Sequence, residues 1–307
     1  MNVCIIGSYA KALVMTTDRI PLAGETLMGY NYRGTYGGKG SDMAVQAARL
    51  GARVSYVGVV GDDAFGKEFV DLMKQERIDT RFLRVTREQP TGTGFIIKDT
   101  QARNLIVVAP GANDLFNEGD IDAANAAVRE ADVLLAQLEI PIATALYAMK
   151  QGKRAGKTTI LNPAPGVDLT AYDLSDVSIL TPNETEARIA AGLPPNSPLS
   201  NKDIAKILLN TGCGCVVTTL GDKGAAVFSN DESFEVEHYE INVVDSNGAG
   251  DSFNAALAAT LAGGATLRES VSRANAAAAL CCTRWETVPS YHTKQEVDAF
   301  LQSRKGG

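Results

Sequence analysis

The chain has 307 residues, of which 45% are hydrophobic, and it carries a formal net charge of −7 with a pI near 5.0. This length and composition predict a globular protein with one large domain, or one large and one small domain. The acidic balance argues against nucleic acid or an anionic membrane surface as the main partner.

We expect a cytoplasmic protein. No segment reaches the ~18 apolar residues of a membrane span, and the first residues lack the pattern of a signal peptide. The five cysteines are an odd number in a long chain, which fits buried thiols better than a disulfide framework. With two histidines in the whole sequence, a Cys/His metal site is not indicated.

Short apolar runs alternate with helical patterns along most of the chain. We expect strands at 3–6, 54–60, 133–138, 158–161, 179–180, 215–219 and 225–228. We expect helices at 41–50, 65–75, 121–130, 140–150, 184–191, 201–210 and 267–282. This alternation predicts a doubly wound α/β fold, with a mostly parallel sheet flanked by helices.

Two stretches, 12–36 and 91–108, break this rhythm and alternate polar with apolar residues, which predicts antiparallel strands. We expect residues 10–36 and 91–108 to form a small β-sheet lid, and residues 1–9, 37–90 and 109–307 to form the core. The lid would close over a site at the carboxyl ends of the parallel strands. Because open strand edges favour pairing between copies, we also expect a homodimer through the lid.

The most informative segment is Asp245–Phe253, which reads Asp-Ser-Asn-Gly-Ala-Gly-Asp-Ser-Phe and runs into an apolar helix. Gly248 and Gly250 let backbone N–H groups point together at the positive end of the helix dipole, which makes an anion cradle. A carboxylate beside phosphate, here Asp251, suits a group that takes a proton, so the pair indicates phosphoryl transfer to a hydroxyl. The alternative is an ordinary acidic first turn of a core helix.

Two other nucleotide-binding patterns are excluded. Residues 152–158 resemble a Walker A loop but have three residues between the glycines where four are needed, and they precede a predicted strand instead of following one. We expect the end of a helix there. No Gly-x-Gly-x-x-Gly follows the first strand, which argues against an NAD-dependent dehydrogenase.

Five motifs in order resemble the ribokinase-like (phosphofructokinase-B type) carbohydrate kinases, and within that family the ribokinases most closely. They are Gly37-Gly38-Lys39-Gly40, Leu161–Pro165, Thr181–Ala187, Thr219–Gly224 and Asp245–Phe253. The resemblance covers nearly the whole chain and implies an α/β core with a β lid. It also implies an ATP-dependent kinase that phosphorylates a primary hydroxyl of a ribose-like sugar.

The resemblance assigns roles to individual positions. Asp251 is implied as the general base, and the amides of Gly248, Ala249 and Gly250 as the γ-phosphate site. Sugar-contacting positions are Gly38, Lys39, Gly40, Asp42, Glu139 and Asp251. Nucleotide-contacting positions are Asn183, Thr219, Gly221, Asp222, Gly224, Gly250 and Asn275. Glu186, with Asn183, would hold Mg²⁺ through water, and a K⁺ site would involve Asp245, Asn247, Cys281, Arg284, Glu286 and Ser290.

The chain departs from the ribokinase pattern at the sugar site. Ala10 and Ala12 stand where ribokinases carry Asn and Asp, and Asp42 replaces an asparagine with an acceptor-only group. Losing such partners changes discrimination strongly, so the identity of the sugar stays open. Lys11 or Tyr9 could supply replacement contacts. Glu286 replaces a small residue and would be strained at positive φ.

Three functions remain open from the sequence. The first is an ATP-dependent kinase for a pentose-like sugar. The second is a nucleoside or ketohexose kinase of the same family. The third is a non-catalytic sugar or nucleotide sensor, which is disfavoured because the base and the glycines are intact.

Overall fold

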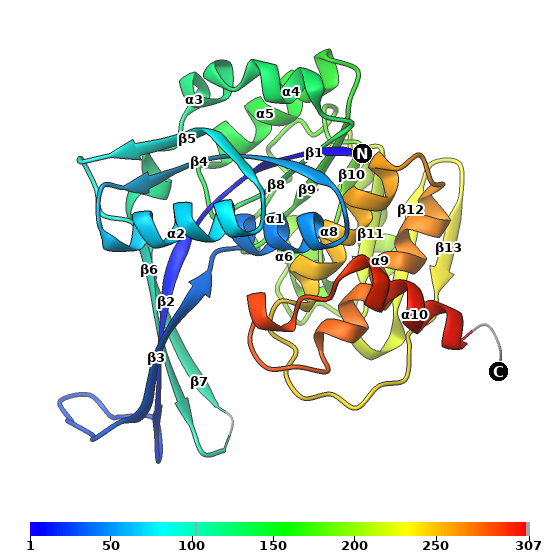
Figure 1. The fold of residues 1–307 in the computed structure, drawn as a ribbon. Coiled ribbons are helices and arrows are strands. Elements are labelled where there is room, and N and C mark those ends of the chain that lie inside the picture. The colour runs from blue at the N-terminus through cyan, green and yellow to red at the C-terminus, as the bar shows by residue number, and fades with distance from the viewer. Residues whose placement is uncertain (102, 305–307) are drawn as a thin grey trace.

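The computed structural model describes residues 1–101 and 103–304, and its core is a nine-stranded sheet (Figure 1). The strand order is β13-β12-β11-β10-β9-β8-β1-β4-β5. All pairs from β11 to β5 are parallel, and β12 and β13 add an antiparallel edge. The strands are β1 (Asn2–Ile6), β4 (Arg53–Gly61), β5 (Asp79–Thr86), β8 (Val133–Gln137), β9 (Thr158–Asn162), β10 (Ile179–Leu180), β11 (Cys215–Thr219), β12 (Ala225–Ser229) and β13 (Ser233–Val236). The predicted doubly wound α/β class is confirmed.

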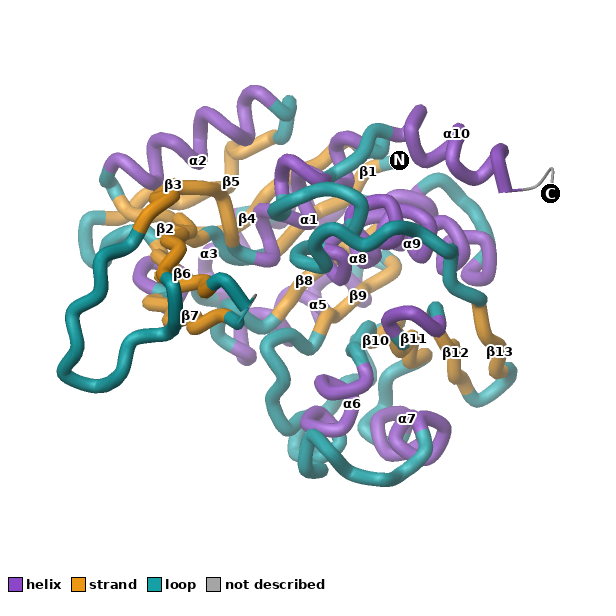
Figure 2. The backbone as a smooth tube through the Cα atoms, turned by 90° about the horizontal axis from the view of Figure 1, so that it is seen from below, coloured by secondary structure: helices purple, strands orange, loops and turns teal. Residues whose placement is uncertain are grey.

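Helices cover both faces of this sheet, as Figure 2 shows. On one face pack α1 (Lys39–Arg49), α2 (Ala64–Gln75), α8 (Ala249–Ala262), α9 (Leu267–Cys281) and α10 (Lys294–Arg304). On the other pack α3 (Glu118–Ala123), α4 (Asn125–Glu130), α5 (Ile142–Arg154), α6 (Glu184–Ala190) and α7 (Asn201–Leu209). The interior strand β1 is apolar on both sides, with Val3 and Ile5 facing the first group and Cys4 and Ile6 the second. Three short 3₁₀ helices, η1 (Gly111–Leu115), η2 (Gly221–Lys223) and η3 (Val288–Ser290), complete the elements.

The structure differs from the predicted elements in a few places. The single helix expected at 121–130 is two short helices, because Ala124 closes α3 and its ψ of 11° turns the chain before α4 begins. The two edge strands, β5 and β13, were not expected, since their side chains are only partly buried and carry no continuous apolar run. The helix end expected at 152–158 is confirmed, with α5 ending at Arg154 and β9 starting at Thr158.

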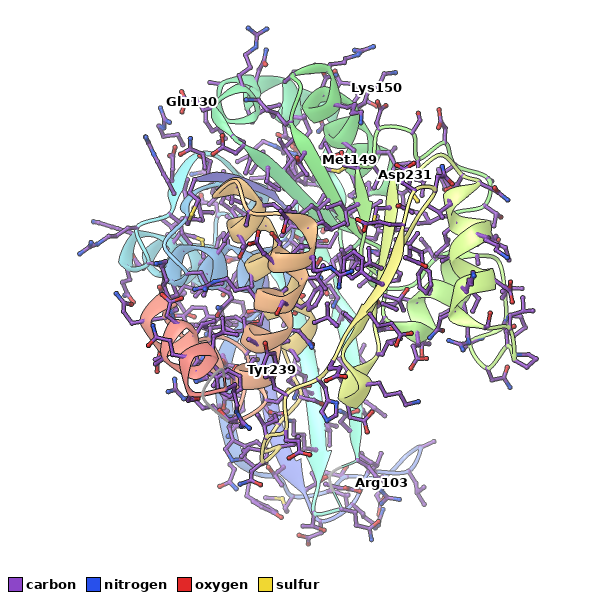
Figure 3. All side chains as sticks on the ribbon, turned by 90° about the vertical axis from the view of Figure 1, so that its right-hand side faces the viewer. Arg103, Glu130, Met149, Lys150, Asp231 and Tyr239 are labelled. Carbon is purple, nitrogen blue, oxygen red and sulfur yellow. The ribbon has the colours of Figure 1, made fainter. Side chains whose placement is uncertain are left out.

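A second, smaller sheet projects from the core where the sequence predicted a lid, and we call it the lid (Figure 1). It consists of β2 (Ala10–Thr17), β3 (Tyr30–Gly37), β6 (Gly92–Asp99) and β7 (Asn104–Ala109), in the order β3-β2-β6-β7. The outer pairs are antiparallel, whereas the two central strands run parallel and leave the core side by side at Ala10 and Gly92. Arg103, between β6 and β7, marks the far end of the lid in Figure 3.

Within the described residues no helix is long and apolar enough to span a bilayer. All five cysteines are free thiols. Four of them are buried in the core, as the sequence predicted.

Candidate active site

The start of α8 is the glycine-containing turn that the sequence predicted as an anion site. Gly248 is the residue before the helix and adopts φ 79°, ψ −2°, a left-handed conformation that favours glycine. A Cβ at this position would lie 2.7 Å from the hydroxyl of Tyr291. The N–H groups of Gly248 and Gly250 make no hydrogen bond to residues 1–101 or 103–304, while that of Ala249 donates to the Ser246 carbonyl at 3.3 Å. Two free amides therefore lie at the positive end of a fourteen-residue helix.

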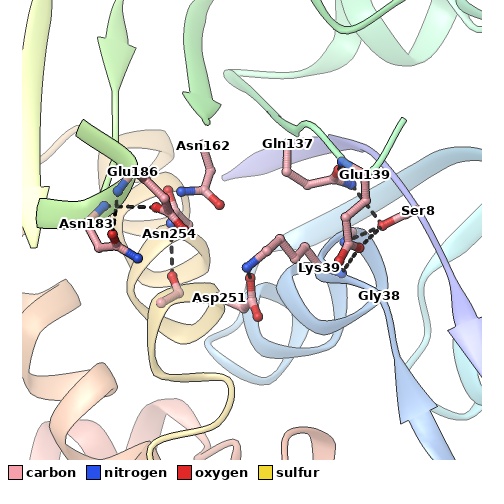
Figure 4. Close-up of polar contacts among 12 residues, drawn as sticks. Ser8, Gly38, Lys39, Gln137, Glu139, Asn162, Asn183, Glu186, Asp251 and Asn254 are labelled. Carbon is pink, nitrogen blue, oxygen red and sulfur yellow. Dashed lines mark hydrogen bonds and ion pairs between the residues drawn. The ribbon is translucent and has the colours of Figure 1, made fainter. Parts of the chain in front are cut away.

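Asp251 sits in the first turn of the same helix and is only 7% exposed. Its Oδ1 lies 3.7 Å from Nζ of Lys39, the first residue of α1 (Figure 4). Burial raises the pKa of Asp251 to about 6, against the opposing pull of the Lys39 ammonium. Asp251 in turn raises the pKa of Lys39, which keeps the lysine charged. A carboxylate with a pKa near 6 is ionised at neutral pH and basic enough to accept a proton.

Two further carboxyl groups lie on the Lys39 side of the site. Asp42 is buried, its Oδ1 has no partner within the described chain, and burial together with the nearby Asp251 holds its pKa well above the usual range. Glu139 accepts hydrogen bonds at Oε2 from the Lys39 backbone N–H at 2.8 Å and from the Ser8 hydroxyl at 2.6 Å (Figure 4). The second oxygen of Glu139 stays available to a ligand.

Two cavities meet at the start of α8. The smaller, of about 280 Å³, lies between the lid and the core and includes Asn247, Gly248 and Asp251 in its wall. The larger, of about 870 Å³, includes Ser246, Ala249 and Gly250. The turn 246–251 therefore separates the two cavities and contributes to both, which places Asp251 on the smaller side and the Gly250 amide on the larger.

The smaller cavity brings together most of the residues expected to contact sugar. Those in its wall are Ala12, Gly38, Lys39, Asp42, Glu139 and Asp251. Ala10 and Gly40 are not in the wall. Gly40 instead allows α1 to approach the segment that follows β1, because a Cβ there would lie 2.5 Å from the Ser8 backbone nitrogen.

Neither candidate for a replacement sugar contact faces this cavity. Tyr9 stacks on Phe69 with ring centroids 4.2 Å apart, and Lys11 forms an ion pair with Glu68. Both lie on the opposite side of β2 from Ala12. The expected contacts from Lys11 or Tyr9 are therefore absent from this structure.

The larger cavity contains all the residues expected to bind nucleotide except Asn183, namely Thr219, Gly221, Asp222, Gly224, Gly250 and Asn275. The Asn275 amide donates to the Glu237 carbonyl at 2.6 Å, which fixes the loop after β13 over α9. Residues 238–243 of that loop and Arg304 also line the cavity. These residues were not predicted, because they are irregular or terminal positions without a motif. Tyr239, one of them, is labelled in Figure 3.

Asn183 and Glu186 form a reciprocal cap at the start of α6. The Asn183 side chain accepts from the Glu186 N–H at 2.8 Å, and Glu186 accepts from the Asn183 N–H at 2.9 Å. Burial raises the pKa of Glu186. Nearby, the Asn254 side chain accepts from Thr181 at 2.5 Å and donates to the Gly250 carbonyl at 2.9 Å, so it ties this motif to α8 (Figure 4).

The residues expected to surround K⁺ lie on two joined segments. Asp245 accepts the backbone N–H groups of Asn247 and Glu286, each at 3.1 Å. The Cys281 thiol contacts the Asn247 carbonyl at 3.6 Å and the Ser290 hydroxyl at 3.0 Å. Glu286 adopts φ 70°, the left-handed conformation in which the sequence predicted strain.

The side chain of Arg284, another residue expected at the K⁺ site, forms an ion pair with Glu296, with the guanidinium nitrogen 2.8 Å from the carboxylate oxygen. The backbone N–H of Arg284 donates to the Cys281 carbonyl at 3.3 Å, so Arg284 also joins this ring of contacts through its main chain. The ring joins the loop before α8 to the segment that follows α9.

An α/β core with a second small sheet, free amides at the start of a helix and a buried carboxylate between two cavities is the arrangement expected of a small-molecule phosphotransferase. Residues 1–294 match the pfkB family carbohydrate kinases, and the chain belongs to this family. It is 39% identical to mouse ribokinase over 306 residues, covering 97% of this chain and 94% of that protein.

Solved structures agree with this assignment. The crystal structure of a Thermotoga maritima ribokinase has a TM-score of 0.89 at 30% identity, covering 98% of this chain and 99% of that one. The Arabidopsis thaliana ribokinase complexed with ribose and ATP has a TM-score of 0.87 at 28% identity and covers 98% of each chain.

Proposed function

We propose that this protein transfers the γ-phosphoryl group of ATP to a primary hydroxyl of a small, pentose-like sugar. The observation that carries the proposal is the position of Asp251, a buried carboxylate with a pKa of about 6 where the two cavities meet. Two relatives support ATP and a pentose as the substrates. The mouse relative is named ribokinase, and the Arabidopsis ribokinase structure is described as a complex with ribose and ATP.

Asp251, Lys39 and the amides of the turn have separate roles in the proposed reaction. With a hydroxyl in the smaller cavity, Asp251 accepts its proton while the oxygen attacks the γ-phosphorus. A new O–P bond forms, the bond from that phosphorus to the β,γ-bridging oxygen breaks, and ADP leaves. The free N–H groups of Gly248 and Gly250 and the Lys39 ammonium stabilise the charge that spreads over the phosphoryl oxygens.

We infer that ATP binds as its Mg²⁺ complex, which supplies charge neutralisation at the phosphates. The described residues contain no group of three His, Cys, Asp or Glu side chains that could hold a metal directly. They fit an ion held through water, with Glu186 and Asn183 at its edge.

We also propose that K⁺ binds among Asp245, the carbonyls of Asn247, Cys281, Arg284 and Glu286, and Ser290. Both oxygens of Asp245 already accept backbone hydrogen bonds, so this ion would tighten an existing ring of contacts. The test is to compare the rate of ADP release in buffers that contain K⁺ with the rate in buffers that contain Na⁺. A rate that is the same in both would count against the site.

Release of ADP from Mg·ATP tests the central proposal, measured across pentoses, ketohexoses and nucleosides. We expect one acceptor class to raise the rate, and Asp251→Asn to abolish the increase. The matched control is Asp71→Asn, which changes an exposed aspartate on α2. Preference for a nucleoside or ketohexose would change the substrate and keep the mechanism. Nucleotide binding without ADP release for any acceptor would favour the sensor.

We propose in addition that two copies associate through the outer face of the lid. The side chains that point away from the cavity include Phe95 and Val107, which are 55% and 59% exposed, with Tyr32, Met15 and Leu105 beside them. An apolar face of this extent favours burial against a partner. Light scattering at micromolar concentration should give twice the chain mass, and Phe95→Glu should reduce it to one chain. A wild-type monomer would refute the proposal.

A further inference from the structure

The lid presents ordered rows of side chains to the sugar cavity. The pairing register places residues side by side across the four strands, on the face toward the core. One row is Arg33, Val14, Ile96 and Ile106, and the next row toward the tip is Thr16, Lys98 and Asn104. Adjacent rows on one face are roughly 7 Å apart. The cavity face of the lid is therefore apolar in its middle and cationic or polar at its edge and outer end.

Lys98 stands out in this arrangement because it lacks an acidic partner. Arg33 pairs with Glu286 across the lid–core boundary at 2.7 Å. Lys98 is half-buried in the cavity wall, yet it makes no ion pair or side-chain hydrogen bond to any described residue. Partial burial removes hydration from an ammonium, and a partner of opposite charge would compensate.

The three carboxylates of the lid have other partners. Asp99 points to the other face and binds Arg103 at 2.7 Å, Glu25 pairs with Arg19, and Asp18, just beyond the end of β2, accepts the Tyr30 hydroxyl at 3.4 Å. None of the lid residues in the cavity wall is an aspartate or a glutamate. The missing partner of Lys98 is therefore expected to come with a ligand.

The position of Lys98 also sets where on the ligand that charge lies. The carboxyl groups Asp42, Glu139 and Asp251 are at the inner end of the cavity, where they would repel an anion. Lys98 follows Gly94 by four residues along β6, roughly 13 Å toward the tip. A ligand with its reacting hydroxyl at Asp251 therefore extends its other end toward Lys98.

We propose that the phosphate acceptor carries an anionic group, a carboxylate or a phosphate, opposite the reacting hydroxyl, and that Lys98 binds this group. This rests on the proposed function and specifies its substrate. It also gives a reason for the apolar replacements at Ala10 and Ala12: recognition shifts from hydroxyl groups at the inner end of the cavity to a charge at its mouth.

Three acceptors with the same five-carbon chain test the proposal: ribitol, D-ribonate and ribitol 5-phosphate, with D-ribose as a neutral sugar. Each retains a primary hydroxyl. We expect kcat/KM for one of the two anions to exceed that for ribitol about tenfold or more, the effect of a hydrogen bond to a charged group. Whichever anion is preferred identifies the group.

Lys98→Met should remove this preference and leave kcat/KM for ribitol and KM for ATP unchanged. Lys67→Met, an exposed lysine on α2 outside the cavity, is the matched control and should change nothing. The proposal is overturned if wild type uses the neutral acceptors as well as the anions, or if Lys98→Met raises only KM for ATP.

These failures are distinct from failure of the proposed function. Turnover of D-ribose without preference for an anion refutes the inference and keeps the kinase. If none of the acceptors is phosphorylated, calorimetric titration with D-ribonate and ribitol still decides the inference. Tighter binding of ribonate that is lost in Lys98→Met supports it, and equal binding of the two refutes it.

Discussion

Replacing Asp251 by asparagine should stabilise the protein at neutral pH while it abolishes phosphoryl transfer. Burial holds the pKa of this carboxyl at about 6, against 3.8 in its unperturbed state. Between these pH values the folded protein keeps a proton that the unfolded chain releases, so stability falls as the pH rises from about 4 to about 6 and stays lower above. A neutral asparagine avoids this loss.

The expected gain in stability follows from the size of the pKa shift of Asp251. About two pKa units, at about 1.4 kcal/mol each, correspond to roughly 3 kcal/mol above pH 7. For 307 residues, with an unfolding entropy of about 2.1 cal/mol/K per residue, this amounts to about 5 °C in Tm. The difference should nearly vanish at pH 4.

Thermal unfolding at pH 4 and pH 8, followed by circular dichroism, measures this for wild type, Asp251→Asn and the exposed control Asp71→Asn. A variant that is no more stable than wild type at pH 8 would refute the reasoning. So would a stability gain of equal size at both pH values, because it would not come from ionisation of Asp251. The control should match wild type at both.

Three further results are expected. With saturating Mg·ATP, kcat/KM should rise about tenfold per pH unit up to about pH 6 and then level off, because Asp251 must be ionised; a flat profile below pH 6 would exclude it as the base. Lys39→Met removes the cation that lowers the pKa of Asp251, so the midpoint of this profile should move to higher pH; an unchanged midpoint would contradict the ion pair. Gly248→Ala places a Cβ 2.7 Å from Tyr291 Oη, at a residue whose φ is 79°, and should lower the free energy of unfolding by about 1–3 kcal/mol in denaturant unfolding. The control is Gly250→Ala, whose Cβ meets open space and should cost less. Equal losses of stability in the two variants would refute this account.

The regular part of the fold could be predicted because its signals are local. The buried parallel strands show continuous apolar runs, and the glycines of the turn before α8 indicate the anion site directly. The edge strands β5 and β13 were not predicted, because half-buried strands lack such apolar runs.

The side-chain environment of the base could not be predicted in the same way. The contact between Lys39 and Asp251 joins positions 212 residues apart, and that between Arg33 and Glu286 joins the lid to the end of the chain. Such pairs depend on how two elements are placed in space. Neither residue's own neighbourhood in the sequence carries that information.

The turn 246–251 that divides the two cavities also has a consequence for kinetic order. With the nucleotide in the larger cavity and the acceptor in the smaller one, as proposed, neither has to leave before the other binds. The phosphoryl group then passes once, directly between them, with no phosphorylated enzyme in between. Double-reciprocal plots should therefore intersect instead of running parallel, and a chiral γ-phosphate should emerge with its configuration inverted.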